Sequence, residues 1–267
     1  MTGLTYAGYI RVPELLQLQH ARSRADRPLN HSCEHFFIVT HQSTELWLSQ
    51  ILIDLDEASA ALADGRYADA VECLERSAVV LDVMATNLEA LASMPPGRFA
   101  TFRGDLGNAS GAQSGQFAAL DRRLGLRGSG DAPLLEALLE ACDREGVTVE
   151  ELLTPTAAPH SDLARIVLVM LDVSRKSWKW RVMHIELTAK MIGHQRSGTG
   201  GTSGTAWLAG RLSMPFGRLW DAVSTIQREA MAEPHAGQAS REEPACPFAR
   251  NNGHPATGRP RQFAARS

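Results

Sequence analysis

The chain has 267 residues, of which 44% are hydrophobic and 21% charged, and its formal net charge is −3. This composition is ordinary for a globular protein, and the near-neutral charge argues against a nucleic-acid binder, which would normally present a basic face. No apolar run approaches the roughly 20 residues of a bilayer span, and the N-terminus "MTGLTYAGYIRVPELL" lacks the basic flank and apolar block of a secretory signal, so we expect a cytoplasmic protein.

Helical periodicity runs through most of the chain, whereas the period-two alternation of strands is nearly absent. The pattern predicts a helix over 34–64, ended by Gly65, and a helix over 67–94, ended by two prolines. Further helices are expected after "GNASGAQS" (107–114), over about 133–145, over about 161–193, and over 205–233 with a break or kink at Pro215. Long helices of this kind predict an all-α helical bundle.

The C-terminal segment 233–267 differs from the rest of the chain. It is rich in Pro, Gly, Arg and Ala and has almost no large apolar residues. Such a segment cannot bury enough surface to offset the entropy of ordering it. We therefore expect one helical domain over 1–232, followed by a flexible, disordered tail.

The helix over 161–193 carries a histidine, His184, on its apolar stripe. At spacings of three and four the stripe contains Leu163, Ile166, Met170, Val173, Ser177, Trp180, His184, Leu187 and Met191. One interpretation is a core histidine that is hydrogen-bonded to a neighbour. The other is a proximal ligand to haem iron, which needs one neutral imidazole in a dry, aromatic-lined slot. The chain has no Cys-x-x-Cys-His motif, so such a haem would be held non-covalently.

Two other segments offer polar groups to an apolar pocket. Phe37 and His41 are four residues apart on one helix face, so they would line the same wall, and His41 could accept a substrate N–H. Arg103 ends a short aromatic helical turn, where an arginine can hold a carboxylate in a bidentate manner. The alternatives are a hydrogen-bonded core histidine and an arginine that braces a loop.

The segment "GHQRSGTGGTSG" (193–204) places two glycines at the separation of a phosphate-binding loop. Thr199 stands where the lysine should be, and no strand precedes the segment, so we exclude both this motif and the dinucleotide-binding pattern. A flexible connection between helices is the remaining interpretation from the residues alone.

Several motifs occur in a fixed order along the chain. They are "LTYAGYI" (4–10), "HQSTELW" (41–47), "FATFRGDLGNASGAQSGQF" (99–117), and "WRVMH" (180–184) followed by "IG" and "SGTGGTSG". Over about residues 4–231 the sequence resembles the tryptophan 2,3-dioxygenase family, a group of all-helical haem oxygenases. The resemblance implies a bundle with haem b in its core and oxidation of the tryptophan indole by O2, with 2,3-dioxygenation to N-formylkynurenine.

The resemblance also implies roles for individual residues. His184 would be the proximal iron ligand, with Trp180 beside the haem and Ser110 near a haem propionate. His41 would be the distal residue that hydrogen-bonds the indole N–H. The substrate pocket would be formed by Phe37, Phe99, Arg103 and Thr199, in which Phe37 stacks on the indole, Arg103 grips the carboxylate and Thr199 closes on the amino-acid head group. Tyr6 and Tyr9 would reach into a neighbouring subunit's pocket, which implies a homotetramer of swapped dimers.

Three departures from the family pattern surround this pocket. Phe99 stands where a tyrosine is expected, Ser197 is an extra residue, and the chain is short through 125–160. Mono-oxygenation of tryptophan or β-methyltryptophan to an oxindole or hydroxylated product therefore stays open. A non-catalytic haem sensor is a further alternative, although it would not need an arginine for an amino acid.

The four cysteines lie far apart without a Cys-x-x-Cys spacing, which indicates neither a zinc site nor a disulfide framework; they are Cys33, Cys73, Cys142 and Cys246. Cys246 precedes a proline, as a thiolate that binds haem can, but we interpret this pair in the tail as coincidental.

Overall fold

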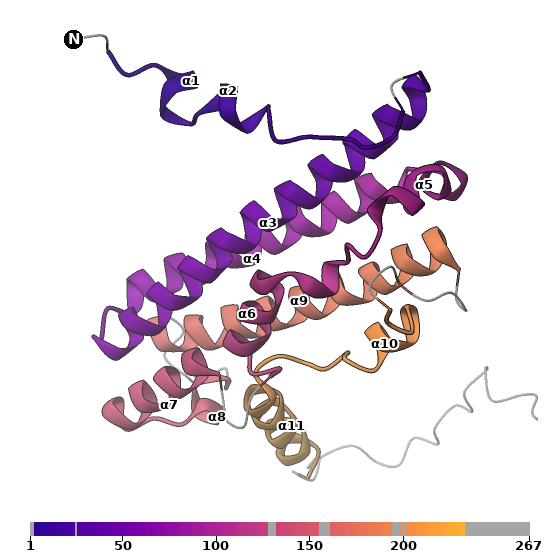
Figure 1. The fold of residues 1–267 in the computed structure, drawn as a ribbon. Coiled ribbons are helices and arrows are strands. Elements are labelled where there is room, and N and C mark those ends of the chain that lie inside the picture. The colour runs from indigo at the N-terminus through magenta and orange to yellow at the C-terminus, as the bar shows by residue number, and fades with distance from the viewer. Residues whose placement is uncertain are drawn as a thin grey trace, which may run out of the picture.

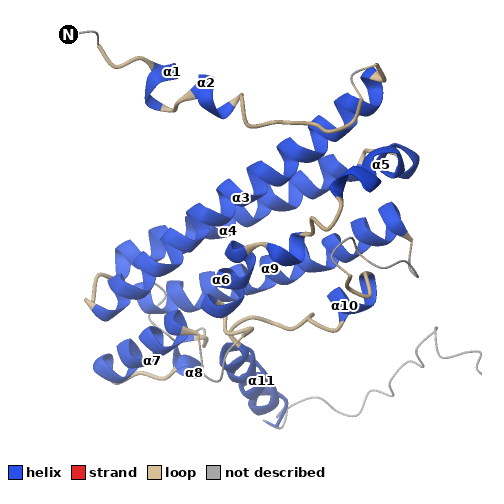
Figure 2. Ribbon diagram, viewed as in Figure 1, coloured by secondary structure: helices blue, strands red, loops and turns tan. Residues whose placement is uncertain are grey.

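The computed structural model describes residues 3–24, 26–127, 132–154, 161–193, 198 and 201–232. Across these residues the structure contains helices and no strand (Figures 1 and 2), which confirms the all-α prediction. The elements in chain order are α1 (Tyr6–Tyr9), α2 (Val12–Leu15), α3 (Pro28–Ala63), α4 (Tyr67–Ala92), α5 (Pro96–Phe102), η1 (Arg103–Leu106), η2 (Gly111–Gln113), α6 (Gly115–Arg123), α7 (Pro133–Glu145), α8 (Val149–Leu152), α9 (Asp162–Ile192), α10 (Thr205–Ala209) and α11 (Gly217–Ala232).

Three long helices, α3, α4 and α9, form the body of the bundle (Figure 1). α4 packs against both of the others, and the shorter α5 lies against α3 and α9. The interior is apolar, because the largest fully buried side chains are mainly leucines of α3, α4 and α7 together with Phe102 and Phe216. This burial is the main favourable contribution to the stability of the bundle.

Side-chain pairs define the directions of the three long helices. Asn87 donates to the Ser43 hydroxyl at 3.1 Å, and Arg76 binds the buried Asp54 carboxylate at 2.8 Å, so α3 and α4 run antiparallel.

Ion pairs between α9 and α4 show the opposite arrangement. Arg165 binds Glu75 of α4 at 2.5 Å, and further on Lys176 binds Asp82 at 2.7 Å, so α9 runs parallel to α4. Consequently the N-terminal half of α3 lies at the level of the C-terminal half of α9.

The predicted boundaries agree with the structure to within a few residues, except at the start of α3 and over residues 210–216, which were expected to be largely helical and are not. α3 begins at Pro28, six residues before the predicted start at 34, because proline at the first helical position fits the helix and needs no N–H partner. α9 ends at Gly193, whose φ of +79° leaves the helical region. The break expected at Pro215 is confirmed by the gap between α10 and α11.

An N-terminal arm, residues 3–18 with α1 and α2, extends away from the body of the bundle (Figure 1). Its large apolar side chains are exposed; they are Leu4, Tyr6, Tyr9, Ile10, Leu15, Leu16 and Leu18. The arm is fastened at its base, where the buried Glu34 carboxylate accepts the backbone N–H groups of Arg22 at 2.9 Å and Ser23 at 2.6 Å.

Within the described residues, no single helix is long and apolar enough to cross a membrane. α4 and the segment Pro96–Leu106 reach the required length and composition only when taken together, and they meet at 87°. Cys33, Cys73 and Cys142 are free thiols. Cys246 and the predicted tail lie outside the described residues, so the division of the chain at residue 232 stays a prediction.

Candidate active site

His184 lies on the stripe of α9 that the helical pattern predicts. The buried members of this stripe are Leu163, Ile166, Met170, Val173, Ser177, Trp180 and Leu187. His184 and Met191 are half-buried. The apolar face is therefore confirmed, and its last member, Met191, lines a cavity at the end of the helix.

Aromatic rings hold the His184 imidazole from one side. The indole of Trp180 lies 5.3 Å from it between ring centroids, with the planes only 12° from parallel. On Trp180 in turn lies the ring of Phe117, at 4.9 Å and 29°. The indole N–H of Trp180 is buried and has no hydrogen-bond partner among the described residues, which makes it a donor able to serve an acceptor group of a ligand.

The electrostatic environment keeps His184 neutral. Surrounding protein atoms lower the pKa of its imidazole from 6.5 to about 4, chiefly because they desolvate the charged form; His41 and Arg181 lower it further. A neutral imidazole has a nitrogen lone pair available at physiological pH. The side chain can thus serve as a metal ligand without first losing a proton.

His41 is placed on α3 with a defined tautomer. Its Nδ1 lies 2.7 Å from the carbonyl oxygen of Phe37, so this nitrogen carries the proton and donates it. Nε2 of the neutral ring is then an acceptor. The pKa of His41 is lowered, mainly by desolvation, while the Phe37 carbonyl and the nearby Glu45 raise it less. As a whole, the His41 residue is nevertheless exposed to solvent.

The two imidazoles come from different helices, α3 and α9, and the charge of His41 acts on His184. The helix directions explain why they are near each other, because the N-terminal half of α3 and the C-terminal half of α9 lie at one level. Two neutral histidines on neighbouring helices can serve one site, in which one binds a metal and the other binds a second ligand.

A cluster of aromatic rings surrounds the His41 side. The ring of Phe37 lies 4.0 Å from the His41 ring and 5.7 Å from both Phe99 and Phe102, all between centroids. Phe99 and Phe102 meet edge to face at 5.4 Å. Phe99 and Phe102 are buried, whereas Phe37 is half-buried. This apolar wall suits a flat aromatic ligand.

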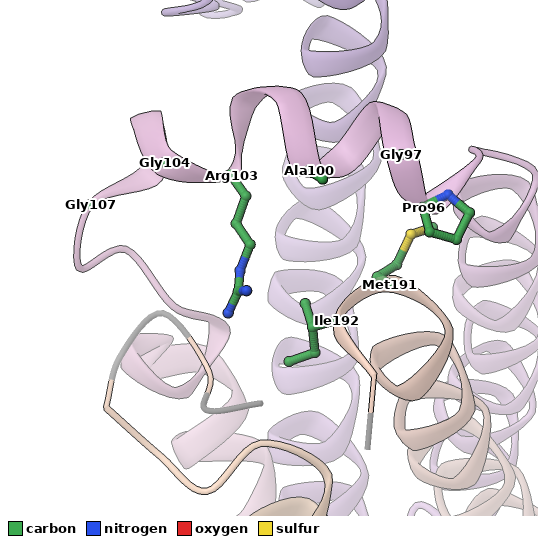
Figure 3. A pocket seen from close by; sticks show the side chains of 8 residues that line it. All are labelled: Pro96, Gly97, Ala100, Arg103, Gly104, Gly107, Met191 and Ile192. Atoms are coloured by element: carbon green, nitrogen blue, oxygen red, sulfur yellow. The ribbon is translucent and has the colours of Figure 1, made fainter. Parts of the chain in front are cut away.

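Arg103 reaches into a cavity of about 630 Å³ beside this cluster (Figure 3). Figure 3 shows its side chain pointing from the start of η1 toward Ile192 at the end of α9. The cavity is lined by Pro96, Gly97, Ala100, Arg103, Gly104, Gly107, Met191 and Ile192. Met191 follows His184 by seven residues, which is about 10 Å along the helix. A half-buried guanidinium at this place can bind a carboxylate.

The structure does not gather every predicted residue at this site. Ser110 is half-buried, and its hydroxyl accepts the backbone N–H of Ala112 at 3.3 Å as the cap of η2. Tyr6 and Tyr9 are 78% and 73% exposed on α1 of the N-terminal arm, which extends away from the body of the bundle (Figure 1). Thr199 and Ser197 lie outside the described residues.

Two aromatic residues of the site were not predicted from the sequence. Phe102 was missed although it lies three residues after Phe99 on the same short helix. Phe117 ends the motif "FATFRGDLGNASGAQSGQF", but nothing in the sequence indicated that it would lie against Trp180. The helical spacing from Phe99 was sufficient to predict Phe102, whereas the position of Phe117 depends on the tertiary packing of α6.

Comparison with known proteins shows the family of the chain. The profile of the family described as "Tryptophan 2,3-dioxygenase" matches residues 1–141 and 153–226. A tryptophan 2,3-dioxygenase of Caulobacter vibrioides is 33% identical over 260 residues, covering 81% of this chain and 96% of the relative. A protein of the same name from Nocardioides sp. is 32% identical over 258 residues, covering 84% of this chain and 95% of the relative. The matched residues include every helix of the bundle body, and this chain is therefore an enzyme of the tryptophan 2,3-dioxygenase family.

Proposed function

We propose that this enzyme is a haem-dependent oxygenase that uses O2 to cleave the 2,3-bond of the L-tryptophan indole, giving N-formylkynurenine. The observation that carries the proposal is a pair of imidazoles with lowered pKa, His41 on α3 and His184 on α9, which are near enough that the charge of His41 acts on His184. The names of the relatives supply the reaction, and an aromatic wall with a nearby arginine suits an amino acid that has an aromatic side chain.

The residues around His184 fit a haem group. His184 would ligate the iron through its neutral imidazole, and Trp180 would lie beside the haem. The unpartnered, buried indole N–H of Trp180 would suit a propionate or another acceptor of the cofactor. Ser110 is proposed to lie near a propionate as well. Bound haem b, held non-covalently, would supply the activation of O2, while the protein supplies binding and orientation.

The substrate would be held by groups on the opposite wall. Nε2 of His41 is an acceptor and would receive the indole N–H. Phe37, beside His41, would lie against the indole ring, and Phe99 would complete the apolar wall. Arg103 would bind the carboxylate in the cavity, which fixes the position of the ring relative to the iron.

Thr199 is proposed to close on the amino-acid head group. The segment around it, residues 198–204, consists only of Gly, Thr and Ser. Residues without bulky side chains allow a loop to approach a small ligand closely and to open again for release.

The exposed arm supports a proposal for assembly. Tyr6 and Tyr9, with the neighbouring leucines, form an apolar surface on a segment that contacts little of its own chain. A homotetramer of swapped dimers would bury this surface in a second copy and bring both tyrosines to its pocket. Removal of residues 1–18 should then lower the molar mass measured by light scattering.

One experiment tests the central proposal. The absorption spectrum of the purified protein is recorded with and without L-tryptophan, and the product of turnover in ¹⁸O2 is analysed by mass spectrometry. A Soret band that shifts with L-tryptophan, together with a product carrying two labelled oxygen atoms, is the expected result. A protein that takes up no haem would overturn the proposal.

A second candidate is insertion of one oxygen atom into tryptophan or β-methyltryptophan. The observation that favours it is Phe99, a buried ring without a hydroxyl group where the family pattern leads us to expect tyrosine. This change removes a hydrogen-bonding group beside the substrate pocket. The same mass measurement distinguishes the two reactions, because the mono-oxygenation product carries one labelled atom.

A further inference from the structure

α6 contacts both helices that carry the histidines: α3, with His41, and α9, with His184. We call these two helices the His41 wall and the His184 wall. On its N-terminal turn, the Gln116 side-chain amide donates to the backbone carbonyl of Glu45 at 2.8 Å and to the Glu45 carboxylate at 2.7 Å. Glu45 lies one helical turn after His41 on α3, so this contact fastens α6 to the His41 wall.

The next residue of α6 contacts the other wall. Phe117 lies on Trp180, and Trp180 lies on His184, so three rings form a continuous stack from α6 to the imidazole. Phe117 therefore restricts Trp180 on one side, and Trp180 in turn restricts the imidazole of His184 on one side.

One turn further along α6, an ion pair fixes the same wall. The Asp121 carboxylate binds Arg181 at 2.6 Å, and its second oxygen binds Arg127 at 2.8 Å. The Asp121 and Arg181 side chains are only 13% and 18% exposed, whereas Arg127 is 43% exposed. Arg181 directly follows Trp180 in α9, and its positive charge acts on His184. Asp121 thus compensates a charge next to the imidazole.

We propose that α6 is a brace that sets the position of His184 relative to His41, and that Phe117 and Asp121 are its positioning residues. Phe117 acts on the imidazole through Trp180, and Asp121 acts through Arg181. The inference rests on the proposed function, because it takes His184 as the haem ligand. Neither Phe117 nor Asp121 would touch the iron or His184. Both would affect the properties of the iron indirectly, through Trp180 and Arg181 of α9.

Replacement of Asp121 by asparagine separates this role from simple packing. The change keeps the shape of the side chain but removes its negative charge, so Arg181 becomes an uncompensated cation near the ligand. A more positive surrounding favours ferrous over ferric iron, and the midpoint potential should rise. Groups that are hydrogen-bonded directly to a metal ligand typically change metal binding about 10–100-fold, and Asp121 acts one residue further away, so haem should leave about two- to tenfold faster.

The test uses the haem-loaded protein with Asp121→Asn and the matched control Arg127→Gln. Haem loss is followed by transfer to excess apomyoglobin, and the midpoint potential by spectroelectrochemistry. In Arg127→Gln an exposed positive charge is removed, so the potential should fall slightly and the rate of haem loss should change less than twofold. If Asp121→Asn leaves both quantities at the wild-type values, or if the two variants behave alike, the inference is wrong.

Phe117→Leu provides a second variant that does not alter charge. It should loosen Trp180, accelerate haem loss, and shift the iron–histidine stretching band in the Raman spectrum of the ferrous protein. An unchanged band would contradict the proposed stack. His184→Ala separates this inference from the proposed function. If that variant keeps its haem ligation, the proposed function is wrong. If His184→Ala loses its haem but the α6 variants behave like the wild type, only the inference about α6 is wrong.

Discussion

The imidazole of His184 lies almost parallel to the indole of Trp180, with the planes 12° apart and the ring centroids at 5.3 Å. The two residues are four positions apart on α9, so the helix itself brings the rings together. The imidazole is thereby oriented in the protein before any ligand binds, which reduces the ordering cost of ligation. This orientation, together with the lowered pKa of the imidazole, makes His184 a suitable ligand.

Replacement of His184 by alanine should abolish stoichiometric haem retention, because the proposed bond between protein and iron is lost. The measurement is the haem-to-protein ratio after gel filtration. The matched control is His35→Ala, which removes an exposed imidazole from α3 and should retain the wild-type ratio. A His184→Ala protein with a normal Soret band and a histidine-ligated spectrum would show that the ligand lies elsewhere.

The stability of the haem-free protein should depend on His184 in mildly acidic solution. Its pKa is about 4 in the folded state and about 6.5 when unfolded, so between these values the unfolded chain binds the extra proton. The free energy of unfolding should therefore decrease as the pH falls from 6.5 to 4, by about 1–3 kcal/mol from this group. Urea titrations of the wild type and of His184→Gln provide the measurement, and the variant should show the shallower pH dependence.

Arg103→Leu should lower kcat/KM by an amount that corresponds to a loss of about 3–5 kcal/mol of transition-state stabilisation, because a desolvated substrate carboxylate would lose its charged partner. Haem content should not change. The side chain lines the cavity, and neither His41 nor His184 is among the residues that line it, so spectral changes in the substrate-free protein should be small (Figure 3). Near-wild-type turnover would mean that the carboxylate is bound by another group.

Glu34→Ala should loosen residues 22–23 at the base of the N-terminal arm, while Gln42 of α3 still binds the Leu18 carbonyl. The variant leaves the backbone N–H groups of Arg22 and Ser23 without their acceptor, which we expect to cost about 1–3 kcal/mol. The pKa of Glu34 is lowered in the folded protein, so the stabilisation is present above the unfolded pKa and is lost as the pH falls through the lower folded value. Faster proteolysis between residues 18 and 24 is the measurement, and an unchanged cleavage rate would contradict the fastening role.

The sequence was sufficient for the helices because their signals are local. Gly65, Gly193 and Pro215 interrupt clear apolar periodicities, and each marks a real boundary or break. The position of His184 on a buried stripe also follows from spacing within one helix. The start of α3 was placed six residues late because residues 28–33 contain few apolar side chains, although Pro28 can begin a helix.

Relations between helices could not be obtained in this way. Whether His41 and His184 come near each other depends on how α3, α4 and α9 pack, and no local pattern in the sequence determines that packing. The stack of Phe117 on Trp180 and the pair of Asp121 with Arg181 join residues about 60 positions apart. Arg103 and Phe99 were found because a short motif contains both of them.

His41 should orient the substrate rather than act as an obligatory base. Its Nδ1 donates to the Phe37 carbonyl, so Nε2 accepts, and a buried hydrogen bond to the indole N–H should contribute about 1–3 kcal/mol. We therefore expect His41→Ala to lower kcat/KM by about tenfold to a hundredfold and to leave appreciable activity. N1-methyltryptophan, which cannot donate this hydrogen bond, should be a poor substrate of the wild type but should lose little further in the variant. If the two losses instead add fully, His41 and the indole N–H do not interact, and the assignment of the substrate side of the pocket is wrong.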